Sequence, residues 1–376
     1  MADYPSVSLI VVNYNGASRF KELLLDCMRS LTQTNYPNYE IIFVDNASRD
    51  GSPDLIPENF RSSNIRVVSL GTNLGYAGAA NAGLQMAKGD IIGILNNDLV
   101  VTPDWLKPLV EVLLSEPGIG IVSPLLLKDP RTIDSVGGET NVLMVSWDRK
   151  SSQPATTVTG EKPLYVLSPP GAAFFFRKEL LTELGNKIFD DDYFAYYEDV
   201  FLGLQCNLMG HKVAVVPRSR ILHKRGSSWG SISPEKYFLL RRNSIWTGII
   251  LFDPVQIICM MPAWTLATIY GGRLYYRLTG NAAYLRVSFT VLFSLLTGFR
   301  KTWLKHVSFS PRKRVPVRSI GLSSTLILDT DRKTLFSRLA IGLVNLAASS
   351  AGLRRDRLTS ITRYPLLDRN HLVERR

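Results

Sequence analysis

Residues 91–98, Ile-Ile-Gly-Ile-Leu-Asn-Asn-Asp, constrain the fold most strongly. An apolar run of strand length stops abruptly at Asn96, Asn97 and Asp98, and apolar residues resume at Leu99. In open α/β sheets, ligands bind at the carboxyl ends of strands, so polar residues placed there line a crevice. A carboxylate at such a position is a hard oxygen ligand that suits a divalent cation. Taken alone, the triplet is also compatible with a plain turn, because Asn and Asp are common turn formers.

Similar apolar runs alternate with helical segments along the first third of the chain. The pattern predicts strands at residues 7–12, 40–44, 65–70, 90–95 and 119–123, with helices at 19–31, 52–60 and 77–88. Thr102–Pro103 is predicted to begin the next helix, since a polar cap followed by proline favours a helix start. Strands that alternate with helices at these intervals indicate βαβ units and a mostly parallel sheet.

The regular pattern stops after Pro124. Residues 128–163 are rich in Asp, Ser, Thr, Gly and Pro, which predicts irregular loops. Order is expected to return at residues 170–176, followed by a helix that starts near Lys178, a second helix at 199–209 and a strand at 212–216. Three cysteines far apart in the sequence argue against a disulfide framework. The first residues lack a basic segment followed by an apolar one, so no secretory signal is expected.

The positive charge of the chain is concentrated near its end. The net charge is +12, of which residues 301–376 contribute 16 Lys/Arg against 5 Asp/Glu, or +11. A nearly neutral body with a basic end indicates a polyanionic partner, either a nucleic acid or an anionic membrane. Nucleic-acid binding would favour basic and aromatic residues interleaved across the body, and the near-neutral body argues against it.

Apolar segments before the basic end favour the membrane. Residues 245–252, 255–270 and 285–299 are apolar, and Trp246 and Trp264 accompany them, with Arg273 among the neighbouring residues. The longest uninterrupted part falls short of the ~20 residues that cross a bilayer. Pro254 and Pro262 are expected to kink any helix there. Aromatic and arginine residues together are typical of helices at the headgroup level, whereas a helical subdomain packed on the body is the alternative.

Polar residues follow each of the first four predicted strands. The loops are Asn13–Gly16, Asp45–Ser52, the glycine-rich segment Gly71–Gly83, and Asn96–Asp98. Carboxyl ends of parallel strands share one sheet edge, so the four loops can line one pocket. Tyr14 can stack on a base, and Asp45 can accept hydrogen bonds from a base or a ribose. The glycines of the third loop let the backbone come close to a ligand.

These loops together resemble family-2 glycosyltransferases of the GT-A fold, particularly the rhamnosyltransferase-like branch. The resemblance covers about residues 6–225 and includes Val-Asp-Asn-x-Ser-x-Asp-Gly-Ser, Asn-x-Gly-x-Ala-x-x-x-Asn-x-Gly and a degenerate Asp-x-Asp motif. It implies that Tyr14 and Asp45 hold the nucleobase, that Asn96 lies near the ribose, and that Asp98 binds Mg²⁺ or Mn²⁺. It also implies donor-binding positions at Asn15, Asn73, Gly78, Asn81, Asn97, Gly171 and Ala172.

The downstream half extends the resemblance to the catalytic residues. Pro170–Ala173 resembles the family's Gly-Ala motif beside the donor and acceptor sugars, and Phe189–Asp199 resembles the segment that ends in a Glu-Asp pair. The resemblance makes Asp199 the general base, and Glu198 then suits the orientation of the acceptor. It makes His223 a second metal ligand. Phe201 and Gln205 depart from the acid and the arginine that the family commonly has there.

The sequence therefore predicts an α/β GT-A domain followed by membrane-associated helices. Residues 1–125 form the nucleotide-sugar half, 126–232 the acceptor and catalytic half, 233–310 the membrane-associated helices, and 311–376 a basic tail. The predicted location is the cytoplasmic face of the cell membrane, as a peripheral or monotopic protein. A homo-oligomer stays open, and no nucleic-acid partner is expected.

The predicted function is that of an inverting, metal-dependent hexosyltransferase in polysaccharide or glycoconjugate synthesis. It takes a nucleotide-diphosphate sugar, with dTDP-rhamnose suggested by the branch, and a glycan or polyprenyl-linked acceptor. One alternative is a nucleotidyltransferase of similar sheet fold, but Asn13–Arg19 lacks the Gly-rich, basic triphosphate loop such enzymes use. The other alternative is a non-catalytic, basic membrane-binding adaptor.

Overall fold

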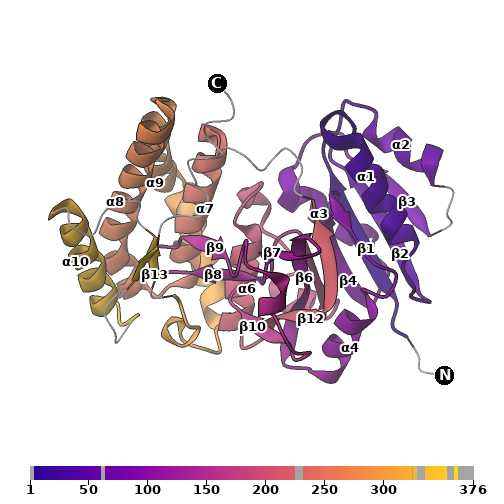
Figure 1. Ribbon diagram of the computed structural model, residues 1–376. Coiled ribbons are helices and arrows are strands. Elements are labelled where there is room, and N and C mark those ends of the chain that lie inside the picture. The colour runs from indigo at the N-terminus through magenta and orange to yellow at the C-terminus, as the bar shows by residue number, and fades with distance from the viewer. Residues whose placement is uncertain are drawn as a thin grey trace. The chain divides into compact units, whose positions relative to one another are not determined.

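The computed structural model describes residues 4–60, 64–224, 232–323, 325–327, 335–353 and 360–362. The chain forms two compact units, one made of residues 1–138 and 148–229, the other of residues 139–147 and 230–376. The first unit contains a large mixed sheet with helices, and the second is mostly helical (Figure 1).

Among the described residues, the sheet of the first unit has the order β10-β12-β6-β11-β4-β1-β2-β3, with β5 beside β12 and β7 beside β6. The strands are β1 (Val7–Asn13), β2 (Tyr39–Asp45), β3 (Ile65–Ser69), β4 (Ile91–Asn96), β5 (Leu99–Val100), β6 (Ile119–Asp129), β7 (Thr132–Ser135), β10 (Leu164–Val166), β11 (Ala173–Arg177) and β12 (Lys212–His223). Strands β1 to β4 pair in parallel, as do β6 and β12, whereas β11 runs antiparallel to β4 and β6. The predicted α/β fold is confirmed, with antiparallel strands added in its second half.

Helices cover both faces of this sheet. They are α1 (Gly16–Thr32), α2 (Ser52–Asn59), α3 (Gly75–Met86), α4 (Lys107–Ser115), α5 (Leu180–Leu184) and α6 (Glu198–Leu208), with short 3-10 turns η1 (Ala155–Thr157) and η2 (Asp191–Tyr193). Leu24 and Met28 of α1 join the core that includes Leu9. On the other face, α3 lies very close to the strands, because a Cβ at Gly83 would be 2.5 Å from Ile10 Cγ2 and 2.8 Å from Val44 Cγ2.

The structure differs from three sequence predictions about this unit. Strand β6 does not stop at residue 123 but continues through Pro124, which pairs with Val216 next to a register shift in β12. Proline lacks the N–H of a regular ladder, so an irregular register accommodates it. The predicted loops at 128–163 contain β7 and further short strands. The helix expected at Thr102–Pro103 begins at Lys107 instead, and the Thr102 carbonyl accepts a turn hydrogen bond from Trp105.

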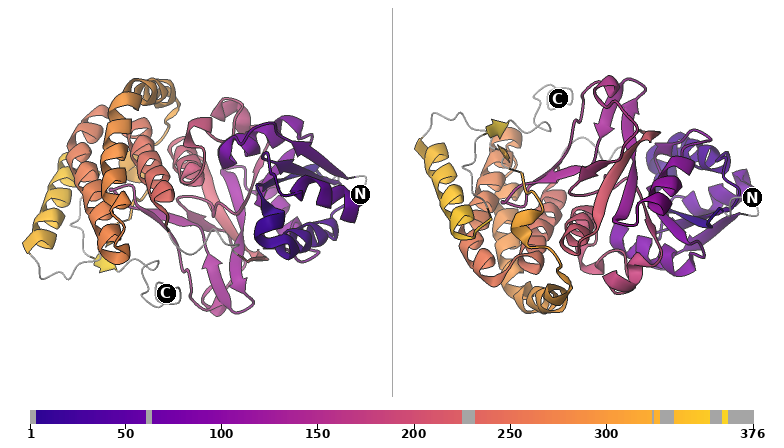
Figure 2. Two further views of the ribbon diagram at one scale, coloured as in Figure 1. Left: turned by 90° about the horizontal axis from the view of Figure 1, so that it is seen from above. Right: turned by 90° about the horizontal axis from the view of Figure 1, so that it is seen from below.

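The second unit is built around long helices. They are α7 (Pro234–Leu251), α8 (Pro254–Thr279), α9 (Ala283–Phe309) and α10 (Leu335–Ser350), with turns η3 (Ser310–Arg312) and η4 (Val317–Ser319) and short strands β8 (Gly138–Thr140), β9 (Ser146–Asp148), β13 (Thr325–Ile327) and β14 (Ser360–Thr362). Helices α7, α8 and α9 run side by side in all views (Figures 1 and 2). Trp264 is fully buried among them, where its Nε1 donates to the Val142 carbonyl at 3.0 Å.

Pro254 and Pro262 occupy different places in α8. Pro254 is the first residue of α8, after a capping box formed by Asp253 and Gln256. Pro262 lies inside the same continuous helix, and a kink of the helix at this residue stays a prediction. Among the described helices, α8 is the one long and apolar enough to cross a membrane, although a core helix of a soluble protein can meet the same criterion. Residues 354–359 and 363–376 of the predicted basic tail lie outside the described residues.

Candidate active site

The carboxyl ends of β1, β2 and β4 lie side by side, as the sequence predicted. Asn13 pairs with Asp45 across β1 and β2, and Val12 pairs with Asn96 across β1 and β4. The register continues into β3, where Ser69 pairs with Asp45. The polar residues at these strand ends therefore share one edge of the sheet, which is where ligands bind in this class of fold.

Asn13 ties this edge together, although the sequence pattern did not single it out as a site residue. Its Nδ2 donates to Asp45 Oδ1 at 2.8 Å, and its Oδ1 accepts from Asn97 Nδ2 at 2.6 Å. The other Asp45 oxygen, Oδ2, accepts from the backbone N–H of Ser48 at 2.9 Å. Gly16 leaves room for this arrangement, because a Cβ there would lie 2.3 Å from Asn13 Oδ1. Asp45 and Asn97 are thus buried and already held by the protein itself.

Tyr14 and Asn15 follow β1 directly. Tyr14 is 37% exposed, and the guanidinium of Arg19 lies 5.6 Å from the centre of its ring. Asn15 has a left-handed backbone with φ 51°, and its Oδ1 accepts from the N–H of Arg49 at 3.0 Å. The open ring of Tyr14 suits the predicted stacking on a base. Asn15, in contrast, holds the loop after β2.

Asn46 fixes the loop that leads into α3. Its Nδ2 donates to Asn73 Oδ1 at 2.9 Å and to the Gly75 carbonyl at 3.1 Å, and its Oδ1 accepts from the N–H of Leu74 at 2.8 Å. Gly78 packs against this loop, since a Cβ there would lie 2.6 Å from Leu74 Cβ. Asn73 and Gly78 therefore shape the loop, and contact of either with a ligand stays a prediction.

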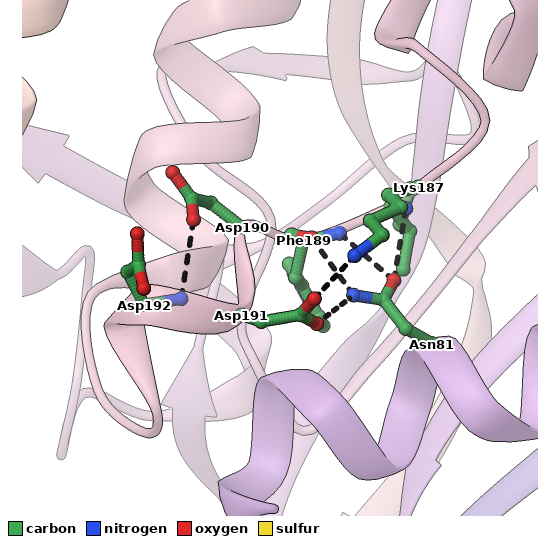
Figure 3. A network of polar contacts seen from close by, with 7 residues as sticks. Asn81, Lys187, Phe189, Asp190, Asp191 and Asp192 are labelled. Atoms are coloured by element: carbon green, nitrogen blue, oxygen red, sulfur yellow. Dashed lines mark hydrogen bonds and ion pairs between the residues drawn. The ribbon is translucent and has the colours of Figure 1, made fainter. Parts of the chain in front are cut away.

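Asn81 occupies the centre of a polar network between α3 and the segment before α6 (Figure 3). Its Nδ2 donates to the Phe189 carbonyl at 2.8 Å and to Asp191 Oδ1 at 2.7 Å. Its Oδ1 accepts from the N–H groups of Ile188 and Phe189 at 3.1 and 3.3 Å. Lys187 pairs with the other Asp191 oxygen. The side chain of Asn81 thus anchors the segment that carries the acidic pair, and donor contact by Asn81 stays a prediction.

His223 connects Asp98 to another acid, Asp134, that sequence reasoning missed. His223 Nδ1 lies 2.8 Å from Asp134 Oδ2, and Nε2 lies 3.4 Å from Asp98 Oδ1. The pairing of Leu99 in β5 with His223 in β12 brings these side chains together. Burial acts to lower the pKa of His223, but hydrogen bonds to Asp134 and Asp98 outweigh it and raise this pKa to about 9. All three side chains are buried.

The arrangement offers two candidate metal ligands rather than a complete protein site. Within the described part of the chain, no group of three or more His, Cys, Asp or Glu residues has the geometry to hold a metal ion. Asp98 offers a carboxylate oxygen and His223 an imidazole nitrogen. A carboxylate on the far nitrogen of a histidine is the common support of a metal-binding imidazole, because it fixes the ring and its tautomer.

Glu198 and Asp199 begin α6, where the sequence predicted the catalytic pair. Glu198 is 7% exposed, and its Oε2 is buried with no hydrogen-bond partner among the described residues. Burial raises the pKa of Glu198, with the charge of Asp199 as a second cause. Burial also raises the pKa of Asp199, although the N–H of Val200, 2.8 Å from Asp199 Oδ1, opposes this shift. Desolvated carboxylates of this kind are typical of acid–base sites.

Gly171 and Tyr76 complete the surroundings of Asp199. A Cβ at Gly171 would lie 2.6 Å from Asp199 Oδ2, so only glycine leaves the carboxylate its place. The phenol of Tyr76 donates to the Gly171 carbonyl at 3.3 Å. Burial and then the charges of Glu198, Asp199 and Asp98 raise the pKa of Tyr76 far above its ordinary value. Tyr76 was not predicted; its only signal was a large aromatic residue in a stretch of small ones.

Ala172 links the two halves of the site through its backbone. Its carbonyl accepts from the N–H of Asn96 at 2.9 Å, directly after the antiparallel pairing of β11 with β4. Donor-side Asn96 and acid-side Gly171 are therefore neighbours of the same residue. The first unit thus gathers the exposed Tyr14, a carboxylate–histidine pair and a buried acid pair at one sheet edge.

Comparison with known proteins places this domain in a family. Residues 8–185 match the sequence model of "Glycosyl transferase family 2". The chain contains a family-2 glycosyltransferase domain. It is 29% identical over 60% of its length to the O-antigen biosynthesis protein RfbC of Myxococcus xanthus, 18% of which is covered. It is 28% identical over 59% of its length to N-acetylglucosaminyl-diphospho-decaprenol L-rhamnosyltransferase of Mycobacterium tuberculosis, 77% of which is covered.

The fold is that of GT-A glycosyltransferases. A crystal structure of GalNAc-T7 with UDP, GalNAc and Mn²⁺ aligns with a TM-score of 0.56 at 20% identity, over 70% of this chain and 52% of that one. At this identity the likeness concerns the fold alone. The family-2 domain therefore has the predicted GT-A architecture, and the chain spans less than two thirds of some of the proteins it matches.

Proposed function

We propose that this family-2 glycosyltransferase is an inverting enzyme in which Asp199 is the general base. The observation that carries the proposal is the buried pair Glu198–Asp199, held against Gly171 at the sheet edge that also bears Asp98 and Asn96. One base beside one reacting centre suits a single in-line displacement. Asp199 takes the proton of an acceptor hydroxyl while that oxygen forms a bond to the anomeric carbon of the donor. The bond from that carbon to the nucleoside diphosphate breaks, and the configuration inverts.

Glu198 has a different part in the proposal. Because burial and the charge of Asp199 raise the pKa of Glu198, it is favoured in its protonated form when Asp199 is ionised. A protonated carboxyl donates one hydrogen bond and accepts others. Glu198 can therefore orient the acceptor hydroxyl without competing for its proton.

The donor nucleotide is proposed to lie along the first four strand ends. Tyr14 stacks on the base with its exposed ring, and Arg19, beside that ring, is close enough to attract phosphate charge. Asp45 receives the base edge, and Asn96 lies near the ribose. The loop held by Asn46 borders the diphosphate in this proposal.

Asp98 and His223 fit a Mg²⁺ or Mn²⁺ ion bound together with the diphosphate. A carboxylate oxygen and an imidazole supported by Asp134 supply two ligands, and diphosphate oxygens and water suit the remaining positions of such a cation. When bound, the ion stabilises negative charge on the departing diphosphate. Loss of a proton from His223 would accompany binding, because a coordinating imidazole is neutral.

The substrates are proposed from the named relatives. The mycobacterial relative is named as an L-rhamnosyltransferase acting on N-acetylglucosaminyl-diphospho-decaprenol, and RfbC is named for O-antigen biosynthesis. A deoxysugar such as rhamnose, supplied as dTDP-rhamnose, and a polyprenyl-diphosphate glycan are the corresponding donor and acceptor here. The protein would then act in the synthesis of a cell-surface glycan.

Attachment to the cytoplasmic face of the membrane is part of the same proposal. Exposed apolar side chains line one face of α9 and of α8, namely Phe289, Phe293, Leu296, Leu304 and Val307, and Val255, Ile258, Leu266 and Ile269. Exposed basic residues accompany these rows: Arg273 and Arg277 follow that of α8, Arg286 precedes that of α9, and Arg300 and Lys301 lie within the latter. Attraction to an anionic leaflet adds about 1 kcal/mol for each basic residue close to it. Helices of this kind lie in the interface plane, and lipid-linked acceptors are found there.

The function is tested by product formation. The full-length protein is incubated with a panel of nucleotide-sugars and a short-chain polyprenyl-diphosphate N-acetylglucosamine, and released nucleoside diphosphate and product linkage are measured. Transfer with inversion from one donor, lost on chelation of divalent metal, supports the proposal. A retained anomeric configuration, or transfer unaffected by EDTA, contradicts it.

The membrane part is tested separately by flotation with vesicles of phosphatidylcholine and phosphatidylglycerol. Full-length protein should float, and replacing Phe289, Phe293 and Leu296 together by serine should reduce the floating fraction at unchanged nucleotide binding. If the protein stays at the bottom of the gradient at low salt, the proposed membrane attachment is wrong, and the proposed reaction is unaffected.

A further inference from the structure

The segment before the acidic pair has an unusual backbone. Phe194 has φ 62° and ψ −65°, and the N–H of Ala195 donates to the Tyr193 carbonyl at 2.7 Å. These values describe a γ-turn of the rare, strained hand, centred on Phe194. Tyr196 and Tyr197 also have positive φ, 66° and 76°. Three large aromatic residues within four positions therefore adopt a conformation that such side chains disfavour.

Contacts with the start of α3 hold the turn. The Phe194 carbonyl accepts from the N–H of Ala77 at 3.1 Å. Gly75, with φ 73°, lies so close that a Cβ there would be 2.2 Å from the same carbonyl oxygen and 2.6 Å from Phe194 Cδ2. Tyr193 is fully buried and stacks on Phe201 with ring centres 5.1 Å apart. The surrounding structure thus fixes Phe194 on both sides.

The result of this strain is an exposed aromatic ring rather than a buried one. Phe194 is 42% exposed, whereas Tyr193 and Tyr197 beside it are buried. Leu74, which immediately precedes Gly75, is 44% exposed. Core packing accounts for the buried Tyr193 and Tyr197 but not for the ring of Phe194, which stays exposed. Positive φ at a residue whose own ring stays exposed is a reason to look for a ligand.

The position of the two exposed apolar residues, Phe194 and Leu74, indicates the class of ligand. Tyr76, next to Gly75, donates to the Gly171 carbonyl, and Gly171 lies against the Asp199 carboxylate. The pair therefore stands within a few residues of the proposed base, where the acceptor must lie. A pyranose ring has one face of slightly positive C–H groups and a rim of hydroxyls, and the face of an aromatic ring is negative. Stacking on Phe194 would orient such a sugar and leave its hydroxyls to the acids.

We propose that Phe194 and Leu74 form the acceptor subsite of this enzyme, taking the C–H face of the pyranose that receives the new bond. The inference rests on the proposed function and deepens it, because neither the family match nor the relatives' names assign any residue to the acceptor. The strained turn keeps the ring rigid, so little side-chain freedom is lost when the sugar binds.

The test compares kinetics of Phe194→Ala and Phe194→Tyr using the nucleotide-sugar and the short-chain polyprenyl-diphosphate N-acetylglucosamine of the function assay. Phe194→Ala should raise the acceptor KM about ten- to thirtyfold, leave the donor KM unchanged and keep the same inverted product. Phe194→Tyr keeps the ring face and should stay within about twofold of the wild type. Phe194→Gly relieves the positive φ and should lose acceptor affinity without losing thermal stability.

Tyr165→Ala is the control, because Tyr165 is also an exposed aromatic residue, at 56%. It pairs with β12 near the start of that strand, whereas His223 of the candidate site lies at its end. An unchanged acceptor KM in Phe194→Ala, or equal rises in the KM of donor and acceptor, overturns the subsite. A loss of thermal stability in Phe194→Gly that parallels its loss of affinity also overturns it. If the wild type transfers nothing to this acceptor, the proposed function itself fails, and the subsite fails with it.

Discussion

The donor side and the acid side of this site are built in opposite ways. On the donor side, Asn13 bonds both Asp45 and Asn97, and Asn46 bonds the loop before α3. On the acid side, Glu198 is buried with an oxygen that has no partner among the described residues, and the backbone before it is strained. The donor side is satisfied internally and gives a rigid frame. The acid side keeps desolvated groups ready for a substrate.

The largest effect should come from removing the base on the acid side. Asp199→Asn keeps the shape of the side chain but cannot take a proton, so kcat should fall about 10²- to 10⁴-fold while nucleotide binding is retained. Steady-state rates measure kcat, and titration with nucleotide measures donor-side binding separately. Asp54→Asn, at an exposed residue of α2, is the control. If Asp199→Asn keeps the wild-type kcat, Asp199 is not the base, and the proposed contrast between the two sides fails.

The next effect concerns the support behind the proposed metal ligands. Asp134→Asn removes the charge that holds His223 Nδ1 at 2.8 Å, so Mn²⁺ affinity should fall about 10- to 100-fold. Electron paramagnetic resonance of free Mn²⁺ measures this without any turnover. The control is Asp129→Asn, whose carboxylate lies in an exposed turn. Equal Mn²⁺ binding in both variants would mean that Asp134 only packs.

A smaller effect, on stability, should follow from removing the side chain of Asn81, which connects α3 to the segment before the acid pair. Asn81→Ala leaves the N–H groups of Ile188 and Phe189 without their acceptor. The free energy of unfolding should fall by about 1–3 kcal/mol, because buried polar groups lose their partners. Urea unfolding measures it. Asn59→Ala, which loses one exposed bond to Leu55, should cost much less, and an equal loss would show that the network of Asn81 is not a special anchor.

The smallest effect is a gain of stability that depends on pH. Burial raises the pKa of Glu198 in the folded state, so the folded protein binds more protons than the unfolded one above the ordinary glutamate pKa. Stability is therefore lost as pH rises through that window. Glu198→Gln should raise Tm near pH 8 and leave it unchanged near pH 4. A Tm gain of the same size at both values would refute the linkage to ionisation.

The sequence predicted the donor edge well because its signals are local. An apolar run that ends in Asn, Asp or Gly marks a strand end wherever it occurs, and β1, β2 and β4 follow that rule. The sequence did not predict Asp134 as a site residue, because it lies in a turn-rich stretch and contacts His223 only through the pairing of distant strands. The exposure of Phe194 could not be predicted from the sequence, since positive φ at an aromatic residue has no sequence signature.

The short pairing of β5 with β12 has a consequence for how ligands bind. Leu99 and His223 are opposite each other in the ladder, so backbone hydrogen bonds, not a bound ion, set the spacing of Asp98 and His223. Binding at a preformed site follows simple mass action without coupled folding. Its stabilisation should then grow as RT ln(1 + [L]/Kd), about 2.7 kcal/mol at one hundred times Kd.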